Sequence, residues 1–555
     1  MSNPFLQTSR TVANEFLQNI VFIDDKAFTD DATNNEFDAL KITSNFAKSK
    51  KICAVYKPET ESDIDVFAQI AKKADITVVD WRIKLEESDE HEDGDEDADE
   101  DDPRGPHTRK IIREILLDPV TGANSLKLIL IYTGEIDLQE ITDAVYDDLV
   151  ANGVSGVQKG NFEVSTENVR IIIIAKPAGG EESGGGEPKF KHNPELNARV
   201  VSYENLPNFI LDRFTEMTAG LVSNVALTAI TNLRLNNFKI LKVYNKHLDP
   251  AFLAHRAMLP VPDDASELLK ETIINSFYAI LDYSNIDEIC TYKSIKNWLQ
   301  TNTFTEQELK IQSKILKLNV NELQKWQRQG FKAAIGDIWK KQFPRISLEP
   351  SNIGTKYKDL HKNWNDYFVP TSSGGNRHEE FSILTHQKSN FANPNYIPKL
   401  TMGTIVQGKK DGKFWICIQQ KCDCVRINPG EARRFLFLPL DVITQSQKHF
   451  DFLFDNGTDY TKLKIDYNSH KIKTIKFNGD NDGVVKARKF GVSPNYFFHP
   501  IYFKSKSNSE HDQNYRWILD LKDSHAQRVA NRYASQLSRI GLDESEWLRR
   551  WATRE

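Results

Sequence analysis

The 555-residue chain lacks the features that mark secreted and membrane proteins. It has five cysteines, an odd number scattered along the sequence, which does not suggest a disulfide-stabilised scaffold. No apolar run approaches the roughly 20 residues of a membrane-spanning helix. The first residues also lack the basic and apolar stretches of a secretory signal. We therefore expect a cytoplasmic protein with no membrane partner.

Common catalytic and metal-binding signatures are also missing. The chain has no Walker A motif, no HExxH and no GxSxG. The spacing of Cys417, Cys422 and Cys424 matches no common zinc framework, and we interpret Cys417 as a core residue. An acidic segment has the spacing of a calcium-binding loop, but His91 stands where Asp or Asn is required.

Negative charge is concentrated in one segment. Residues 86–102 contain thirteen Asp or Glu and no Lys or Arg, whereas the whole chain has a formal net charge of −6. Removing that −13 leaves +7 for the remainder. Such a charge run cannot form a core and predicts a solvated surface insertion. Nucleic-acid binding is not favoured, because the most basic stretch, residues 486–506, is better interpreted as a solvated face.

Five apolar segments near the N-terminus predict a parallel sheet. They are short and rich in β-branched residues, as strands buried on both faces are. Helical patterns over residues 60–73, 108–117 and 138–151 alternate with them. This alternation predicts a doubly wound, flavodoxin-like α/β domain. The predicted strands are residues 20–23, 52–55, 76–79, 128–132 and 171–175.

Polar side chains follow four of these strands. Asp24 and Asp25 follow the first, Asp80 the third, Thr133 the fourth and Lys176 the last. The carboxyl ends of parallel strands lie at one edge of a sheet, so these side chains are expected to converge. Transfer of a phosphoryl group to a carboxylate needs a nucleophilic Asp, carboxylates for Mg²⁺, a cation and a hydroxyl donor. The five residues supply that set.

The order of these residues resembles that of the receiver domain of two-component response regulators, over about residues 15–180. The resemblance implies that Asp80 accepts a phosphoryl group from a histidine-kinase-like sensor, while Thr133 and Lys176 contact the phosphoryl oxygens. The intervals from Asp80 to Thr133 and from Thr133 to Lys176 are 53 and 43 residues, longer than in ordinary receivers. The implied Mg²⁺ ligands are Asp24, Asp25, Asp80 and the backbone carbonyl of Arg82.

Other interpretations of the strand-end residues stay open. A haloacid-dehalogenase-type phosphatase also uses a strand-end Asp, but it needs Asp-x-Asp, and Lys26 stands at the second position. A degenerate receiver would fold without being phosphorylated and act as an interaction scaffold. A phosphorylation-gated effector would need an unrecognised activity in residues 196–555, with His255, Arg256, Asp423 and Arg426 as candidates. Beyond self-phosphorylation and its reversal, we do not expect the chain to be an enzyme.

Beyond this segment, the composition and the predicted secondary structure change along the chain. A Gly- and Glu-rich stretch predicts a flexible linker. Helical patterns follow, one of them over residues 305–316, and residues 347–398 are expected to be irregular. Alternating strands with an Asp-Gly hairpin signal come next. The predicted division is a receiver-like domain at 1–178, a linker at 179–195, a mainly helical domain at 196–398 and an α+β domain with C-terminal helices at 399–555.

The layout as a whole resembles large receiver-containing proteins of bacterial antiphage defence operons of the Detocs type. Segments 251–256, 422–426 and 541–547 carry this resemblance. It implies a companion receiver that acts as a phosphoryl sink or relay. The implied partners are a histidine-kinase-like sensor and a receiver-containing effector from the same operon, and a homodimer is compatible with the sequence.

Overall fold

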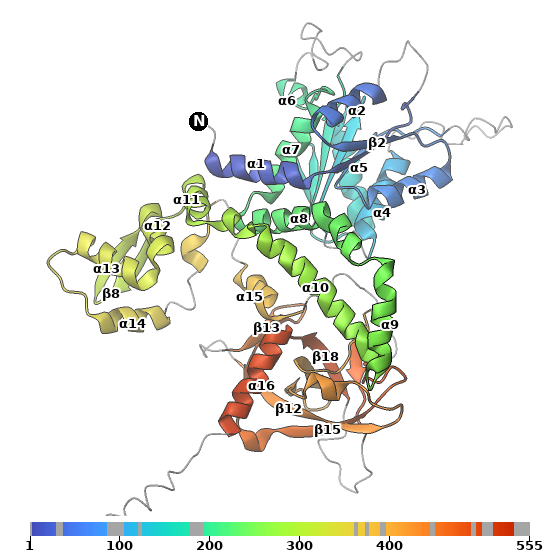
Figure 1. Cartoon of the computed structure of the whole chain (residues 1–555). Helices are drawn as coiled ribbons and strands as arrows, with labels where there is room; N and C mark the ends of the chain where they lie inside the picture. The colour runs from blue at the N-terminus through green and yellow to red at the C-terminus, as the bar shows by residue number, and fades with distance from the viewer. Residues whose placement is uncertain are drawn as a thin grey trace, which may run out of the picture. The chain divides into compact units, whose positions relative to one another are not determined.

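The chain forms two compact units in the computed structural model (Figure 1). The first comprises residues 1–306 and 317–341, and the second residues 307–316 and 342–555. The predicted acidic insertion, most of the predicted linker and residues 538–555, where part of the predicted C-terminal helices falls, lie outside the described residues. The structure describes residues 3–28, 37–85, 105–119, 122, 125–177, 190, 193–359, 365–371, 377–388, 396–443, 450–489, 495–501 and 514–537.

The first unit is built around a seven-stranded sheet. Its five parallel strands are β1 (Asn19–Ile23), β2 (Ile52–Tyr56), β3 (Ile76–Val79), β4 (Lys127–Thr133) and β7 (Val169–Ala175). An antiparallel hairpin of β5 (Gln158–Gly160) and β6 (Glu163–Ser165) extends the edge at β7. The order is β2-β1-β3-β4-β7-β6-β5, and its parallel part is the flavodoxin-like order. All five predicted strands are therefore present.

Helices cover both faces of this sheet, which is why its strands are apolar throughout. On one face lie α3 (Glu61–Ala71), α4 (Pro106–Leu117) and α5 (Leu138–Ala151), packed on Val21, Ile23 and their neighbours. On the other lie α1 (Pro4–Phe16), α2 (Ala39–Lys48) and α7 (Leu206–Thr218), packed on Ile20 and Phe22. Because α7 follows the predicted linker, the second covering layer includes residues beyond 195.

Three hydrogen bonds hold the chain that enters α7 against the sheet, one of them from the backbone N–H of Ala175 to the carbonyl oxygen of Arg199 at 3.0 Å. The hydroxyl of Tyr132 in β4 donates to the carbonyl oxygen of Val201 at 2.7 Å. The backbone N–H of Val201 donates to the carbonyl oxygen of Ala175, the last residue of β7, at 3.1 Å. The segment before α7 therefore continues the domain that contains the parallel sheet.

A long helix, α8 (Leu221–Val243), packs beside α1. Its Arg234 Nη2 lies 2.8 Å from Asp75 Oδ1, and the Asp75 carboxylate also accepts the N–H groups of Gln18 and Asn19 at the start of β1. This ties α8 to the start of the sheet. The other helices of the first unit are α6 (Pro194–Asn197), α9 (Asp249–Met258), α10 (Ala265–Tyr283), α11 (Tyr292–Thr301), α12 (Val320–Gln329) and α13 (Phe331–Gln342).

The helix predicted over residues 305–316 is wrong. The segment forms a hairpin of β8 (Gln307–Ile311) and β9 (Lys314–Leu318). Buried residues alternate along both strands, which is the period of a strand rather than of a helix. Gln312 and Ser313 both have positive φ, as a two-residue hairpin turn requires.

The second unit contains a nine-stranded antiparallel sheet. The predicted Asp-Gly hairpin is present, with β10 (Thr404–Gly408) paired to β11 (Phe414–Cys417). The prediction that residues 347–398 are irregular is wrong in part, because α14 (Pro350–Asp359) and α15 (His378–His386) lie there. The remaining elements are β12 (Ala432–Val442), β13 (Phe452–Asp455), β14 (Tyr460–Ile465), β15 (Lys473–Asn478), β16 (Arg488–Lys489), β17 (Tyr496–Phe498), β18 (Tyr515–Asp520) and α16 (Asp523–Leu537). Among the described helices of the chain, none has the length and apolar character needed to cross a bilayer.

Candidate functional site

Four side chains that follow strands lie buried at the carboxyl edge of the parallel sheet. Strands β1, β3, β4 and β7 pair side by side; β1 and β3 end level with each other, and β4 and β7 run two residues farther, to Thr133 and Ala175. Asp24, Asp80, Thr133 and Lys176 are each no more than 6% exposed. The sheet therefore brings these sequence-predicted residues to one place.

Lys176 connects two of the carboxylates. Its Nζ donates to Asp24 Oδ2 at 2.7 Å and to Asp80 Oδ1 at 2.6 Å. Its backbone N–H donates to the carbonyl oxygen of Thr133 at 2.7 Å, which fixes the end of β7 against β4. The ring centroids of Phe37 and Tyr132 lie 5.3 and 6.0 Å from Nζ. One ammonium thus bridges two carboxylates in a buried, largely aromatic surrounding.

Backbone N–H groups orient the same carboxylates from the other side. Asp24 Oδ1 accepts the N–H of Lys26 at 3.0 Å, and Asp80 Oδ2 accepts the N–H of Arg82 at 3.0 Å. In each Asp, one oxygen therefore faces the loop and the other faces Lys176. This fixes the rotation of both carboxylates before any ligand binds.

Asp25 and Thr133 complete this edge of the sheet. Asp25 Oδ1 is buried and has no hydrogen-bond partner. The Thr133 hydroxyl oxygen accepts the N–H of Glu135 at 3.1 Å, so the hydroxyl proton is directed elsewhere. The Asp25 oxygen, which has no donor, can bind a cation, and the Thr133 hydroxyl can still donate to an oxyanion. An oxyanion ligand with its cation would use these two features.

Burial changes the acidity of these groups. Loss of solvent raises the pKa of Asp24 to about 7, although Lys176 opposes that shift. Burial and the nearby Asp80 raise the pKa of Asp25. Burial by itself lowers the pKa of Lys176, but Asp80 and Asp24 together raise it above its ordinary value. The Lys176 ammonium therefore stays charged, and its single positive charge does not balance the negative charges of the neighbouring carboxylates.

The donor set fits a divalent cation that prefers oxygen ligands. Of the three carboxylates, two contact the Lys176 ammonium, and the unpartnered Asp25 oxygen is suited to bind a cation. Mg²⁺ keeps several waters and needs only two or three protein oxygens. Within the described part of the chain, however, no group of three or more His, Cys, Asp or Glu is arranged as a metal centre. Instead, Lys176 Nζ lies between Asp24 and Asp80.

Two contacts beside these residues were missed from the sequence. The hydroxyl of Thr108 in α4 donates to the carbonyl oxygens of Asp80, at 2.5 Å, and Trp81, at 3.1 Å. Arg82 Nε lies 3.1 Å from Glu135 Oε1, which joins the loops after β3 and β4. The predicted helix at 108–117 included Thr108, but nothing in its periodicity indicates a contact with Asp80.

The candidate residues for a second activity are not brought together within one unit. His255 and Arg256 lie in α9 of the first unit, and Arg256 Nη2 lies 2.7 Å from Asp263 Oδ1. Asp423 and Arg426 belong to the second unit, where Asp423 accepts a hydrogen bond from Gln419 at 2.6 Å. Of the three clustered cysteines, Cys417 and Cys424 are buried in an apolar core and Cys422 is exposed.

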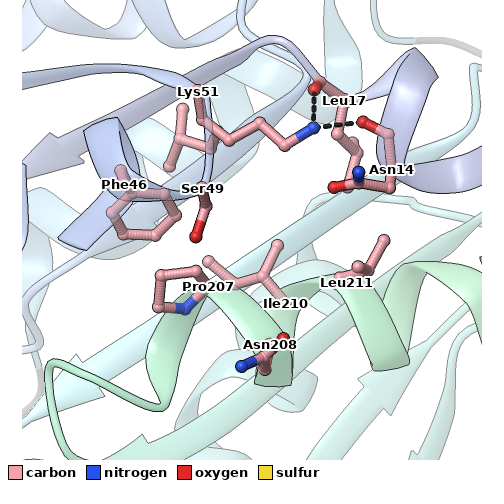
Figure 2. A pocket seen from close by; sticks show the side chains of 10 residues that line it. Asn14, Leu17, Phe46, Ser49, Lys51, Pro207, Asn208, Ile210 and Leu211 are labelled. Atoms are coloured by element: carbon pink, nitrogen blue, oxygen red, sulfur yellow. Dashed lines mark hydrogen bonds between the residues drawn. The ribbon is translucent and has the colours of Figure 1, made fainter. Parts of the chain in front are cut away.

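A small pocket lies between α1, α2 and α7 (Figure 2). The Lys51 ammonium faces it, but donates to the carbonyl oxygens of Asn14 and, at 2.6 Å, Leu17 at the end of α1 (Figure 2). Such carbonyls have no partner inside a helix, so Lys51 caps α1. Burial lowers the pKa of this lysine. We therefore interpret the pocket as part of the helix packing.

Comparison with known proteins identifies the first domain. A family model described as response receiver domain matches residues 16–181. No curated protein and no solved structure matches the chain. The matched segment contains every strand-end residue considered above and ends before α7. Residues 16–181 are accordingly a receiver-type domain, a class that accepts phosphoryl groups in two-component-like signalling.

Proposed function

We propose that this chain is a receiver protein in which Asp80 accepts a phosphoryl group from a histidine-kinase-like sensor. The supporting observation is the contact of Lys176 with Asp24 and Asp80, at the carboxyl ends of three parallel strands and inside the matched receiver segment. A buried carboxylate beside a lysine, a second carboxylate and a threonine hydroxyl is the set that aspartyl phosphorylation requires.

Asp80 is the nucleophile in this proposal. One of its carboxylate oxygens attacks phosphorus in line with the P–N bond of a phosphohistidine; the P–O bond forms as the P–N bond breaks, and the leaving imidazole takes up a proton. Lys176 already lies 2.6 Å from Asp80 Oδ1, so its ammonium can move to a phosphoryl oxygen without leaving the site. The Thr133 hydroxyl donates to a second phosphoryl oxygen.

The Mg²⁺ of this proposal would be held by the carboxylates of Asp24, Asp25 and Asp80 and the carbonyl of Arg82. When bound, it neutralises charge on the oxygens of the acceptor and the phosphoryl group. The buried, unpartnered Asp25 oxygen supports this assignment.

The biological role that we propose is a phosphoryl sink or relay in an antiphage defence operon. It rests on the resemblance of the whole layout to the companion receivers of such operons. In that role, a sensor kinase supplies the phosphoryl group, and a receiver-containing effector from the same operon is the competing acceptor.

Phosphorylation of the full-length chain tests the assignment. Acetyl phosphate, or the cognate kinase with ATP, should add one phosphoryl group in the presence of Mg²⁺ and none after chelation, as measured by intact mass. Asp80→Asn should abolish the addition, while Asp212→Asn, at an exposed ion pair with Arg10, should leave it unchanged. Addition to the Asp80→Asn variant would contradict the assignment.

A second experiment separates the proposed role from a gated effector. If the chain takes up stray phosphoryl groups, Asp80→Asn should make the operon toxic without infection. If phosphorylation instead switches on an activity in residues 196–555, the same substitution should leave cells healthy and undefended. Growth of cells that carry each operon distinguishes the two outcomes.

A further inference from the structure

A buried threonine of α4 holds the backbone that follows Asp80. Thr108 is 0% exposed, and its hydroxyl donates to the carbonyl oxygens of Asp80, at 2.5 Å, and of Trp81, at 3.1 Å. We call residues 80–84 the acceptor loop, because they connect the proposed phosphoacceptor to the segment beyond β3. A side chain 28 residues farther along the chain than Asp80 therefore fixes the first two peptide units of this loop.

Thr108 uses its hydroxyl differently from a typical helical threonine. A threonine inside a helix often donates to the carbonyl oxygen four residues before it, and Thr142 of α5 does so to Leu138 at 2.8 Å. Thr108 lies in the first turn of α4, which begins at Pro106, so the carbonyl four residues before it lies outside the helix. Its hydroxyl proton is therefore available to a partner outside α4, and the acceptor loop supplies one.

Packing around Trp81 keeps α4 against the acceptor loop. The Trp81 side chain is buried and shares a core with Ile111 and Ile112 of α4. At the start of α4, Gly105 approaches the Trp81 ring so closely that a Cβ atom there would lie 2.7 Å from it. The distance from Thr108 to the loop is therefore set by apolar packing, and the hydroxyl meets the two carbonyl oxygens at fixed positions.

The acceptor loop carries groups that contribute to the proposed cation site. The N–H of Arg82 donates to Asp80 Oδ2 at 3.0 Å, and the N–H of Lys84 donates to the Asp25 carboxylate. The carbonyl oxygen of Arg82, a proposed ligand of Mg²⁺, also belongs to this loop. Rotation of the peptide units after Asp80 would therefore move this carbonyl oxygen and the N–H groups that orient two carboxylates.

We propose that Thr108 is a positioning residue for the phosphoacceptor site, whose hydroxyl holds the acceptor loop in the conformation that binds Mg²⁺. This role rests on the proposed function, because it concerns the cation site at Asp80. Thr108 acts through the carbonyl oxygens of Asp80 and Trp81 and does not itself ligate the cation. Loss of its hydroxyl leaves these two oxygens without this donor and frees the loop to rotate. Mg²⁺ affinity and the rate of phosphorylation should then fall together.

Mg²⁺ binding and phosphorylation of the full-length chain test this role. Thr108→Val keeps the shape of the side chain but removes the hydroxyl, whereas Thr108→Ser keeps the hydroxyl. Thr108→Val should weaken Mg²⁺ binding, measured by calorimetry without a phosphodonor, about tenfold, the equivalent of one net hydrogen bond. Labelling by acetyl phosphate at subsaturating Mg²⁺, followed by intact mass, should slow by a similar factor. Thr108→Ser should stay within about twofold of the wild type in both measurements.

Thr142→Val is the matched control. Thr142 is also 0% exposed and its hydroxyl also donates to the backbone, but this bond lies within α5. Thermal melts should show that both valine variants lose stability, whereas Mg²⁺ affinity should fall in Thr108→Val and not in Thr142→Val. Thr108→Ala is a second variant without the hydroxyl, to be used if circular dichroism shows Thr108→Val to be unfolded.

The outcomes separate the positioning role from the proposed function. Wild-type Mg²⁺ affinity and labelling in Thr108→Val would overturn the positioning role, and so would an equal loss in Thr142→Val or in Thr108→Ser. A wild-type chain that binds Mg²⁺ more tightly than Thr108→Val but takes up no phosphoryl group would contradict the proposed function and support the positioning role. A wild-type chain that binds no Mg²⁺ would overturn both.

Discussion

Replacement of Lys176 by methionine removes the ammonium that two buried carboxylates share. Met fills a similar volume, so the change removes charge and hydrogen bonds more than packing. The ammonium lies 2.7 Å from Asp24 Oδ2 and 2.6 Å from Asp80 Oδ1, and all three side chains are less than 10% exposed. Removing one partner from a buried ion pair costs about 3–5 kcal/mol, because the other charge is left without compensation. We expect a loss of that size at pH 8 without Mg²⁺.

The loss of stability caused by Lys176→Met should be smaller at acidic pH. Lys176 opposes the rise in the pKa of Asp24, which already reaches about 7 in its presence. Without the lysine that pKa rises further, so Asp24 binds a proton at pH 5.5 and the negative charge that needs compensation falls. A carboxyl group with a raised pKa in the folded state contributes stability at low pH that disappears as the pH rises through that pKa. The difference between variant and wild type should therefore widen from pH 5.5 to pH 8.

Hydrogen exchange of the intact chain measures this effect locally, which avoids assuming that a chain with two compact units unfolds in one step. Peptides that cover β3 and β7 should lose protection by about one hundred to a few thousand-fold at pH 8, which corresponds to about 3–5 kcal/mol. Lys159→Met is the matched control, because Lys159 pairs with Asp143 at 3.2 Å and both side chains are at least 40% exposed. Surface pairs of that kind contribute about 0–1 kcal/mol. If Lys176→Met and Lys159→Met reduced protection from exchange equally and independently of pH, the reasoning would be refuted.

Two further substitutions have definite expected outcomes. Burial raises the pKa of Asp24 from 3.8 to about 7, so the wild-type chain should lose stability between about pH 4 and pH 7. Asp24→Asn should make this loss smaller in the same exchange experiment. An unchanged dependence of stability on pH would argue against the raised pKa. Gly105→Ala should destabilise the domain by about 1–3 kcal/mol in thermal melts, since Gly105 has a φ of +59° and a Cβ atom there would lie 2.7 Å from the Trp81 ring. Gly153→Ala, at φ +79° in open space, should cost less, and an equal loss at both positions would rule out the clash with Trp81.

The parallel sheet could be predicted because strands buried on both faces leave an unbroken apolar signature. Ile171, Ile172, Ile173 and Ile174 are all buried, so no alternation hides the strand. Prediction from the pattern of apolar residues failed at β8 and β9. Apolar and polar residues alternate there, and a helix was predicted from too few residues. The covering by α7 could not be predicted either, because a stretch with the composition of a linker separates it from β7.

The sequence predicted which residues lie together at this edge of the sheet, but it did not predict the contacts that they form. The shared carboxyl edge of the parallel strands follows from topology, and topology places Asp24, Asp80 and Lys176 together. The bond from Thr108 to Asp80 could not be found in this way, because it depends on how α4 approaches the sheet.

The attachment of α7 has a practical consequence for anyone who wishes to excise or transplant the receiver. A fragment cut at residue 181, where the recognised segment stops, would retain Phe22 and Ile174 but lose Ile210 and Phe214 that cover them. The part of that face that α7 covers would meet water, and such a fragment would be prone to aggregate for reasons unrelated to phosphate chemistry. Because α8 adds Leu227 to the same core and pairs with Asp75 through Arg234, exchange of this domain between proteins must carry both α7 and α8 along.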